Sequence, residues 1–195
     1  MDIDSFLRDP VSRRRFFAGS GLTFAAGSAM FAAACGDGQD TGGVATSREE
    51  DDAADVEILN GALDLELMSV AAYKAAAARL RGEVLQIGKL LVEQEQEHAD
   101  ALVSAVEDAG GTPNRAKSSY DFPELRSQRD ALRFVLELEN TAVAAYIDAL
   151  PRITKSDLRG TASAIVTNEA QHISVLRGAL GLPQVPHAFV NGEAG

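Results

Sequence analysis

Residues 63–73 read Leu63-Asp-Leu-Glu66-Leu-Met-Ser-Val-Ala-Ala-Tyr73, and residues 136–146 repeat the pattern as Leu136-Glu-Leu-Glu139-Asn-Thr-Ala-Val-Ala-Ala-Tyr146. A Glu-x-x-His stretch follows each copy. These two stretches are Glu95-Gln-Glu-His98 and Glu169-Ala-Gln-His172. The chain therefore contains two similar halves, and each half carries two glutamates and one histidine at matched positions.

Apolar residues recur at helical spacing in four stretches, which predicts four helices. These helices are expected to cover about residues 55–80, 83–108, 128–150 and 157–180. Asp55, Ser127 and Ser156 are suitable N-cap residues for three of them. Each apolar stripe contains a glutamate near its middle, and two stripes also contain a histidine. Charged residues thus occupy positions where core residues belong.

The connections between the predicted helices indicate the topology. The first and third connections are short, so each forms the turn of an antiparallel helix hairpin. The second connection holds about 17 residues, which at about 3.3 Å per residue can travel the length of a helix of about 40 Å. The expected fold is all-α: an antiparallel four-helix bundle in which one long crossover joins two hairpins.

Four glutamates on the inner stripes would meet at the middle of such a bundle. Unpaired buried carboxylates cost several kcal/mol each, and no Lys or Arg falls on the inner stripes to neutralise them. Two divalent cations would balance the charge, and oxygen-rich ligation with two imidazoles suits iron or manganese. We expect two Fe ions, or alternatively two Mn ions. The candidate metal ligands are Glu66, Glu95, His98, Glu139, Glu169 and His172. The alternative is a metal-free core with protonated or paired carboxylates.

Two tyrosines share the helix faces of the candidate ligands, whereas several other polar residues do not. Tyr73 and Tyr146 each follow a candidate ligand by seven residues, so they lie on the same helix face and can donate hydrogen bonds to the glutamates, although they could also simply fill the core. Other polar residues fall off the inner stripes or outside the helices. Glu93, Glu97, Glu137 and His187 are expected to face solvent, and Asp100 stays undecided.

The N-terminus resembles a twin-arginine export signal, with Arg13, Arg14 and Phe16 ahead of a mildly apolar stretch that is short for a membrane span. That stretch ends at Ala34-Cys35, which resembles a bacterial lipobox with Cys35 as the acylated residue. The alternative is ordinary signal cleavage with Cys35 incidental. We expect export through the twin-arginine translocase to the periplasmic or cell-surface face of the membrane, with a lipid anchor on Cys35.

These features divide the chain into four parts. Residues 1–35 form the signal peptide, 36–54 a flexible acidic tether, 55–181 the helical bundle and 182–195 a C-terminal tail. The formal net charge of −11 disfavours nucleic-acid binding, because such a field repels phosphate. One cysteine excludes an intramolecular disulfide framework and a Cys-rich zinc site.

The paired Glu…Glu-x-x-His pattern resembles the ferritin-like superfamily over about residues 55–181, and the phrase from Asp55 to Glu66 is similar to its exported, desiccation-related branch. This resemblance implies a ferritin-like bundle with a di-iron or di-manganese site on the six residues named above. The Pro-interrupted tail does not resemble the fifth helix of cage-forming ferritins, and the rubredoxin module of rubrerythrins is missing. The small-cage ferritins of starved cells place their site between subunits, unlike the complete set in this one chain.

Three functions fit these residues. The first is an oxidoreductase that reacts Fe(II) with O2 or peroxide, as a ferroxidase or a peroxidase-like enzyme, with manganese catalase as a variant. It would serve metal homeostasis or oxidative-stress defence. The second is a non-catalytic, metal-binding or stress-protective surface protein. The third is a structural bundle in which the metal is only a staple. An Ala-rich bundle with a free outer face could also form a homodimer.

Overall fold

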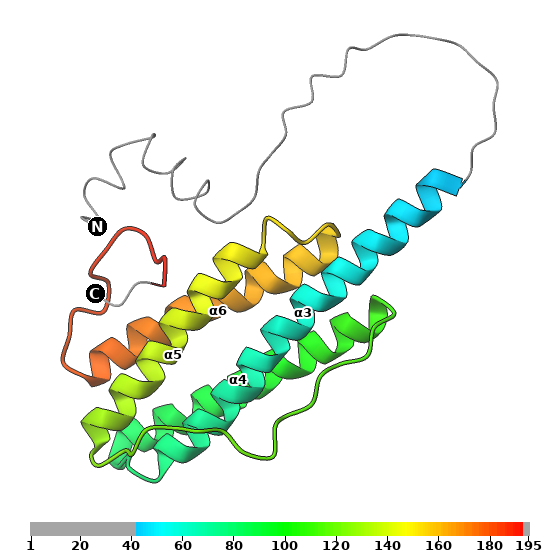
Figure 1. Ribbon diagram of the computed structural model, residues 1–195. Coiled ribbons are helices and arrows are strands. Elements are labelled where there is room, and N and C mark those ends of the chain that lie inside the picture. The colour runs from blue at the N-terminus through cyan, green and yellow to red at the C-terminus, as the bar shows by residue number, and fades with distance from the viewer. Residues whose placement is uncertain (1–41, 193–195) are drawn as a thin grey trace. The chain divides into compact units, whose positions relative to one another are not determined.

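The computed structural model describes residues 42–192 of the chain. This part contains four helices: α3 (Gly42–Ala77), α4 (Gly82–Asp108), α5 (Gln128–Ala149) and α6 (Ser156–Ala179) (Figure 1). No strand occurs within the described range. The expected export-signal residues Arg13, Arg14 and Phe16, and the expected acylation site Cys35, lie outside it. Between residues 42 and 192, no helix is long and apolar enough to cross a membrane.

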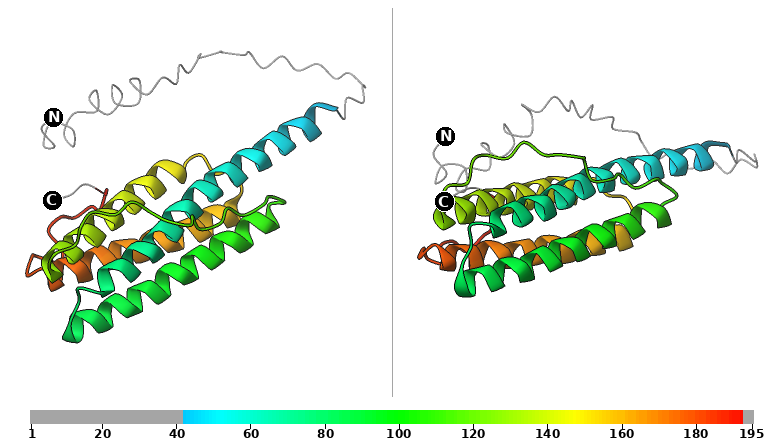
Figure 2. Two further views of the ribbon diagram at one scale, coloured as in Figure 1. Left: turned by 60° about the horizontal axis from the view of Figure 1, so that its bottom comes forward. Right: turned by 90° about the horizontal axis from the view of Figure 1, so that it is seen from below.

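The helices pack as two hairpins, α3 with α4 and α5 with α6. The hairpins meet through contacts of α3 with α5 and of α4 with α6. The connection from α4 to α5 runs back along the bundle, as the second view in Figure 2 shows. The predicted all-α bundle of two hairpins with one long crossover is confirmed.

Hydrogen bonds fix the crossover at two places, one on α3 and one in the turn that follows it. The Asn60 side chain donates to the carbonyl of Thr112 (3.1 Å) and accepts from the backbone N–H of Asn114 (2.7 Å). In the turn just after α3, the Arg79 guanidinium donates to the carbonyl of Leu125 (2.6 Å). These contacts provide partners for backbone groups of a segment that has no regular secondary structure.

Two apolar clusters fill the bundle, one on each side of its middle. One cluster contains Leu59, Leu63, Leu102, Val106 and Ile165 among its buried residues. The other contains Tyr73, Leu80, Leu91, Leu132 and Leu176. Burial of apolar surface contributes about 25 cal/mol per Å², so these clusters are the main source of stability. The stretch of each helix between the clusters carries a glutamate.

The first helix begins earlier than its sequence indicated. It starts at Gly42, so most of the expected tether is helical, and Asp55 lies within α3 rather than at its N-cap. Arg, Glu and Ala between residues 46 and 54 are good helix formers, and they extend the helix. The buried Asp55 carboxylate instead accepts hydrogen bonds from Thr154 N (2.7 Å), Thr154 Oγ1 (2.9 Å) and Lys155 N (3.1 Å). Asp55 therefore holds the two residues that lead into α6, including Lys155 at its N-cap position.

The second half repeats this arrangement with a different residue. Gln128 precedes Glu139 by as many positions as Asp55 precedes Glu66, and its side chain accepts a hydrogen bond from Arg81 N (3.0 Å) just before α4. Each hairpin thus bonds the residue at the N-cap position of a helix in the other hairpin. These contacts relate the two halves by an approximate two-fold symmetry that includes the ends of the bundle.

Of the two serines predicted as N-caps, one caps its helix and the other lies inside its helix. Ser127 caps α5, because its hydroxyl accepts from Asp130 N (3.1 Å). Ser156 is the first residue of α6 rather than its cap; Lys155 holds the N-cap position and makes no side-chain cap bond. The Asp55 carboxylate binds Thr154 and Lys155 at positions ahead of the first helical residue, so it holds the entry to α6 without replacing a side-chain cap.

Candidate metal centre

The six predicted ligands come together at the middle of the bundle, between the two apolar clusters. They form two overlapping groups in which the candidate ligand atoms lie within 4.8 Å of one another. One group is Glu66, Glu95, His98 and Glu169; the other is Glu95, Glu139, Glu169 and His172. Glu95 and Glu169 belong to both groups, so they occupy the place of shared ligands. Glu66 and Glu139 each belong to one group.

The site is almost fully enclosed. The four glutamates and His172 are at most 1% exposed. His98 is the exception, with a side chain that is 11% exposed. A site of this kind strengthens electrostatic interactions, because little water remains to screen them. His98 is the member of the set nearest to solvent.

Both imidazole rings present Nδ1 to the carboxylates. His98 Nδ1 lies 2.8 Å from Glu169 Oε1 and 3.6 Å from Glu66 Oε2. His172 Nδ1 lies 2.9 Å from Glu95 Oε1 and 3.2 Å from Glu169 Oε2. The rings are stacked, with centroids 5.8 Å apart. Each ring thus points the same nitrogen toward the centre of the site.

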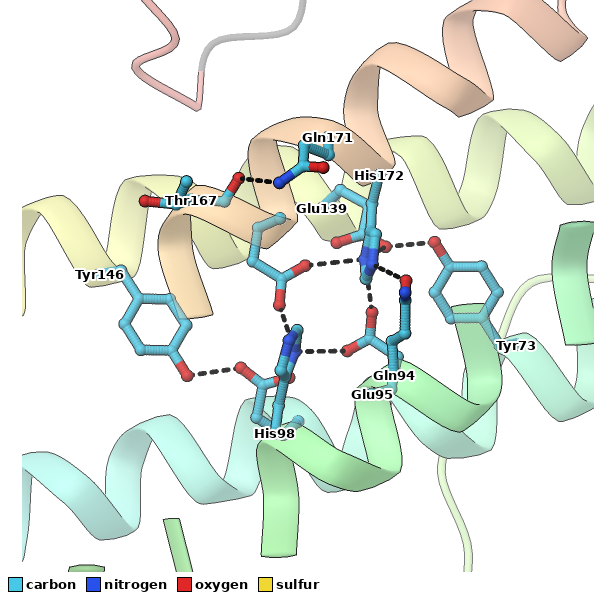
Figure 3. Close-up of polar contacts among 11 residues, drawn as sticks. Tyr73, Gln94, Glu95, His98, Glu139, Tyr146, Thr167, Gln171 and His172 are labelled. Carbon is cyan, nitrogen blue, oxygen red and sulfur yellow. Dashed lines mark hydrogen bonds and ion pairs between the residues drawn. The ribbon is translucent and has the colours of Figure 1, made fainter. Parts of the chain in front are cut away.

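The two tyrosines contact the glutamates of the opposite half. Tyr146 donates a hydrogen bond of 2.5 Å to Glu66 Oε1, and Tyr73 donates one to Glu139 Oε1 (Figure 3). The sequence leaves open whether these tyrosines bond the glutamates or only fill the core, and both hydroxyls bond glutamates of the site. Each bond uses one oxygen of an unshared glutamate and leaves the other oxygen free to face the centre.

One residue of the site was missed. The side chain of Gln94 lies with Oε1 2.9 Å from His172 Nε2, on the side of the ring away from the carboxylates (Figure 3). Gln94 is half-buried and lies one position before Glu95, off the apolar stripe of its helix. No periodic signal marks such a residue, although a glutamine directly before a Glu-x-x-His is a clue that could have been followed.

Eight buried atoms of the six residues have no hydrogen-bond partner. They include both oxygens of Glu95 and of Glu169, one oxygen each of Glu66 and Glu139, and the Nδ1 atoms of the two histidines. Contacts between Nδ1 and the carboxylates are close, yet they lack hydrogen-bond geometry. No Lys or Arg within residues 51–192 pairs with these glutamates. Buried polar atoms normally have partners, and these eight are the nitrogen and oxygen types that iron and manganese bind. The donor set fits a metal pair.

Most of the helical bundle matches one known protein family. The model of the ferritin-like domain family matches residues 54–182. The chain belongs to this family. A comparison with curated proteins finds no match.

Solved structures with the same fold cover most of this ferritin-like domain. A conserved hypothetical protein from Mycobacterium tuberculosis is 23% identical, with a TM-score of 0.63 over 66% of this chain and 98% of that one. A ferritin-like, diiron-carboxylate protein from Bacillus anthracis is 21% identical, with a TM-score of 0.59 over 67% and 97%. A dodecameric thioferritin from Bacteroides fragilis is 20% identical, with a TM-score of 0.61 over 71% and 92%. At these identities the likeness shows the fold.

Without metal, the histidines of this ferritin-like domain hold protons tightly. Burial lowers the pKa of His98, but contacts with the Glu169 and Glu66 carboxylates outweigh burial and raise it from 6.5 to about 10. Burial likewise opposes protonation of His172, whereas contacts with Glu139, Glu169 and Glu95 raise its pKa to about 12. The metal-free site is therefore partly neutralised by two imidazolium groups.

The pKa values of the glutamates are shifted in both directions. Burial raises the pKa of Glu66 to about 8 against the opposing effect of His98, and burial raises the pKa of Glu139 as well. For Glu169, burial is outweighed by its contacts with His172 and His98, which lower its pKa. Tyr73 and Tyr146 have raised pKa values, because burial and the nearby carboxylate charge disfavour the phenolate. Both hydroxyls thus stay protonated as hydrogen-bond donors.

The acids that fall off the inner stripes face solvent. Glu93, Glu97 and Glu137 are exposed, as expected. Asp100 is exposed and accepts a hydrogen bond from Gln96 (3.0 Å). His187 is exposed in the segment after α6.

Proposed function

We propose that this protein holds a dinuclear iron centre and uses it to oxidise Fe(II) or to react with O2 or peroxide, in metal homeostasis or oxidative-stress defence. Manganese is the alternative metal. The observation that carries this proposal is the convergence of eight buried nitrogen and oxygen atoms without a hydrogen-bond partner at one enclosed point of the bundle. The diiron-carboxylate description of the Bacillus anthracis relative supports it.

Each residue has a distinct part in this proposal. Glu95 and Glu169 would be held in common by both metal positions, because they belong to both groups of converging atoms. Glu66 with His98 would complete one position, and Glu139 with His172 the other. A bound metal pair would supply Lewis acidity and redox electrons for reaction with O2 or peroxide. The two tyrosines hold the unshared glutamates in place, and the apolar clusters exclude water.

We also propose that the protein works outside the cytoplasm. The support lies in the sequence alone: the twin-arginine pattern around Arg13 and Arg14, and the lipobox-like Cys35. Acylation of Cys35 would tether the bundle to the membrane surface. Mass spectrometry of the protein from the membrane fraction would test this, since a diacylglycerol adduct on Cys35 is expected and an unmodified, uncleaved N-terminus would contradict it.

A second candidate function is metal binding without turnover. The observation that favours it is the enclosure of the site, in which only His98 approaches solvent and the other five ligands are at most 1% exposed. A ferroxidase must admit Fe(II) and an oxidant repeatedly. A closed site instead suits a metal that stays in place to stabilise or protect the protein.

The test begins with the metal content of the purified full-length chain. Elemental mass spectrometry should find about two Fe or Mn per chain, because two overlapping ligand groups are present. Glu95→Ala should lose both metals, whereas Glu93→Ala, an exposed acid on the same helix, should keep them. Absence of any transition metal after anaerobic reconstitution would overturn the proposal. Consumption of Fe(II) with O2 or peroxide would then separate the two functions: turnover supports the oxidoreductase, and bound metal without turnover supports the second candidate.

A further inference from the structure

We propose that Gln94 positions His172, and that it thereby makes the two metal positions unequal, with the Glu139/His172 position binding its metal more tightly than the Glu66/His98 position. This inference rests on the proposed dinuclear site. It goes beyond that site by assigning a role to a residue outside the ligand set and an order to its filling.

The contact of Gln94 determines which nitrogen of His172 is free. Gln94 Oε1 is an acceptor and lies 2.9 Å from His172 Nε2, so Nε2 must carry a hydrogen and donate it. Nδ1 faces Glu95, Glu139 and Glu169 and can then offer its lone pair to a metal. A hydrogen bond on the far nitrogen fixes both the tautomer and the ring orientation of a metal-binding histidine.

Comparison of the two halves shows that only one of the two histidines has such an amide partner in the part of the chain that the structure describes. Gln94 and Asn168 are equivalent, because each directly precedes the glutamate of a Glu-x-x-His stretch. Asn168 is one methylene shorter, and the structure of residues 42–192 gives His98 Nε2 no amide partner. The His98 side chain is also 11% exposed, against 2% for His172. The tyrosine bond to the unshared glutamate, by contrast, is present at both positions.

This asymmetry has a consequence for binding. A ring already held in its ligating orientation loses less side-chain freedom on metal binding. Removal of such an outer hydrogen-bond partner typically weakens metal affinity about 10- to 100-fold. The His172 position should therefore fill before the His98 position.

Titration with Co(II) tests the inference without any enzymatic assay. The metal-free full-length chain is titrated anaerobically, and the visible absorption of bound Co(II) is followed. The wild-type chain should bind two Co(II) in two unequal steps. Loss of the tighter step in His172→Ala, and of the weaker step in His98→Ala, would assign the steps to the positions.

Three variants then isolate the role of Gln94. Gln94→Ala should weaken the tighter step about 10- to 100-fold and leave the other step in place. Asn168→Ala, the matched change in the other half, should alter neither step. Gln94→Glu keeps an acceptor oxygen at the same distance along the side chain, so it should retain the order of filling. Circular dichroism checks that every variant keeps its helices.

Several outcomes would overturn the proposal. Two equal steps in the wild-type chain would do so, as would an unchanged tighter step in Gln94→Ala or equal effects of Gln94→Ala and Asn168→Ala. In each of these cases the proposed dinuclear site survives, since two Co(II) still bind. A wild-type chain that binds no Co(II) would overturn the site and this inference together.

Discussion

Tyr146 donates a 2.5 Å hydrogen bond to Glu66, a residue of the other half of the repeat, 80 positions away in the chain. Tyr73 makes the reciprocal bond to Glu139. Each tyrosine therefore holds a glutamate that belongs to the partner hairpin. The polar centre joins the two hairpins into one unit. Neither hairpin contains by itself all the candidate ligands of either metal position.

Removal of either hydroxyl should destabilise the protein. Tyr146→Phe or Tyr73→Phe keeps the buried ring and leaves a carboxylate oxygen without its donor, which costs about 1 to 3 kcal/mol. Chemical denaturation of the metal-free chain measures this loss. Tyr120→Phe is the control: Tyr120 is only half-buried, and its hydroxyl accepts a 3.3 Å bond from Lys117 N, so the change should stay within about 0.5 kcal/mol. Equal stabilities of Tyr146→Phe and the wild-type chain would contradict the prediction.

The contacts of Asp55 and Gln128 at the bundle ends allow a second matched comparison. Asp55→Ala removes a buried carboxylate that accepts three hydrogen bonds from Thr154 and Lys155, so it should cost about 2 to 4 kcal/mol. Gln128→Ala removes one neutral bond to Arg81 N and should cost about 0.5 to 1.5 kcal/mol. Urea unfolding of both variants gives the ranking. A larger loss for Gln128→Ala than for Asp55→Ala would contradict this ranking.

Much of this architecture could be predicted from the sequence, because the site violates the ordinary apolar pattern of its helices. Glu66 and Glu139 interrupt apolar stripes at matched places in a visible repeat, and two Glu-x-x-His stretches do the same. Such interruptions cost free energy unless function or partners compensate them, so they mark the centre of the bundle. The long connection after Asp108 was sufficient to indicate the crossover.

The parts that could not be predicted depend on contacts between distant segments. Asp55 has the side chain of a good N-cap, and its local sequence does not reveal that it bonds the residues just before α6, about a hundred positions later. Gln94 lies off the apolar stripe, and only the position of His172 on another helix gives it a role. The start of α3 at Gly42 was missed because an acidic, Gly-containing segment is typical of both a solvated helix and a tether.

The stability of the metal-free protein should fall as the pH rises from 6 to 9. His98 and His172 have folded pKa values raised from 6.5 to about 10 and about 12, and Glu66 has one raised from 4.5 to about 8. A group whose pKa is raised by folding contributes stability below its unfolded pKa, and that stability is lost as the pH rises through the folded value. The lowered pKa of Glu169 acts in the opposite direction, but only in acid, below its ordinary value of 4.5.

Thermal unfolding of the chelator-treated chain at pH 6, 7.5 and 9 measures this dependence. His98→Gln should flatten it, because the variant lacks one of the groups that lose a proton. Saturating metal should remove or reverse it, since metal ions compete with protons for the same atoms and bind better at higher pH. A metal-free chain that is more stable at pH 9 than at pH 6 would show that the histidines are neutral in the folded protein.

The distinction between shared and unshared glutamates predicts different metal stoichiometries. Glu169 belongs to both ligand groups, whereas Glu139 belongs only to the group that contains His172. Glu169→Ala should therefore abolish binding of both metals, as Glu95→Ala should. Glu139→Ala should leave the group of Glu66, Glu95, His98 and Glu169 complete, and one metal per chain should remain. Glu137→Ala, an exposed acid two residues away on the same helix, should retain two metals. Elemental mass spectrometry of the three variants measures the number of metals per chain. One metal in Glu169→Ala would contradict its role as a shared ligand, and none in Glu139→Ala would contradict its role as an unshared one.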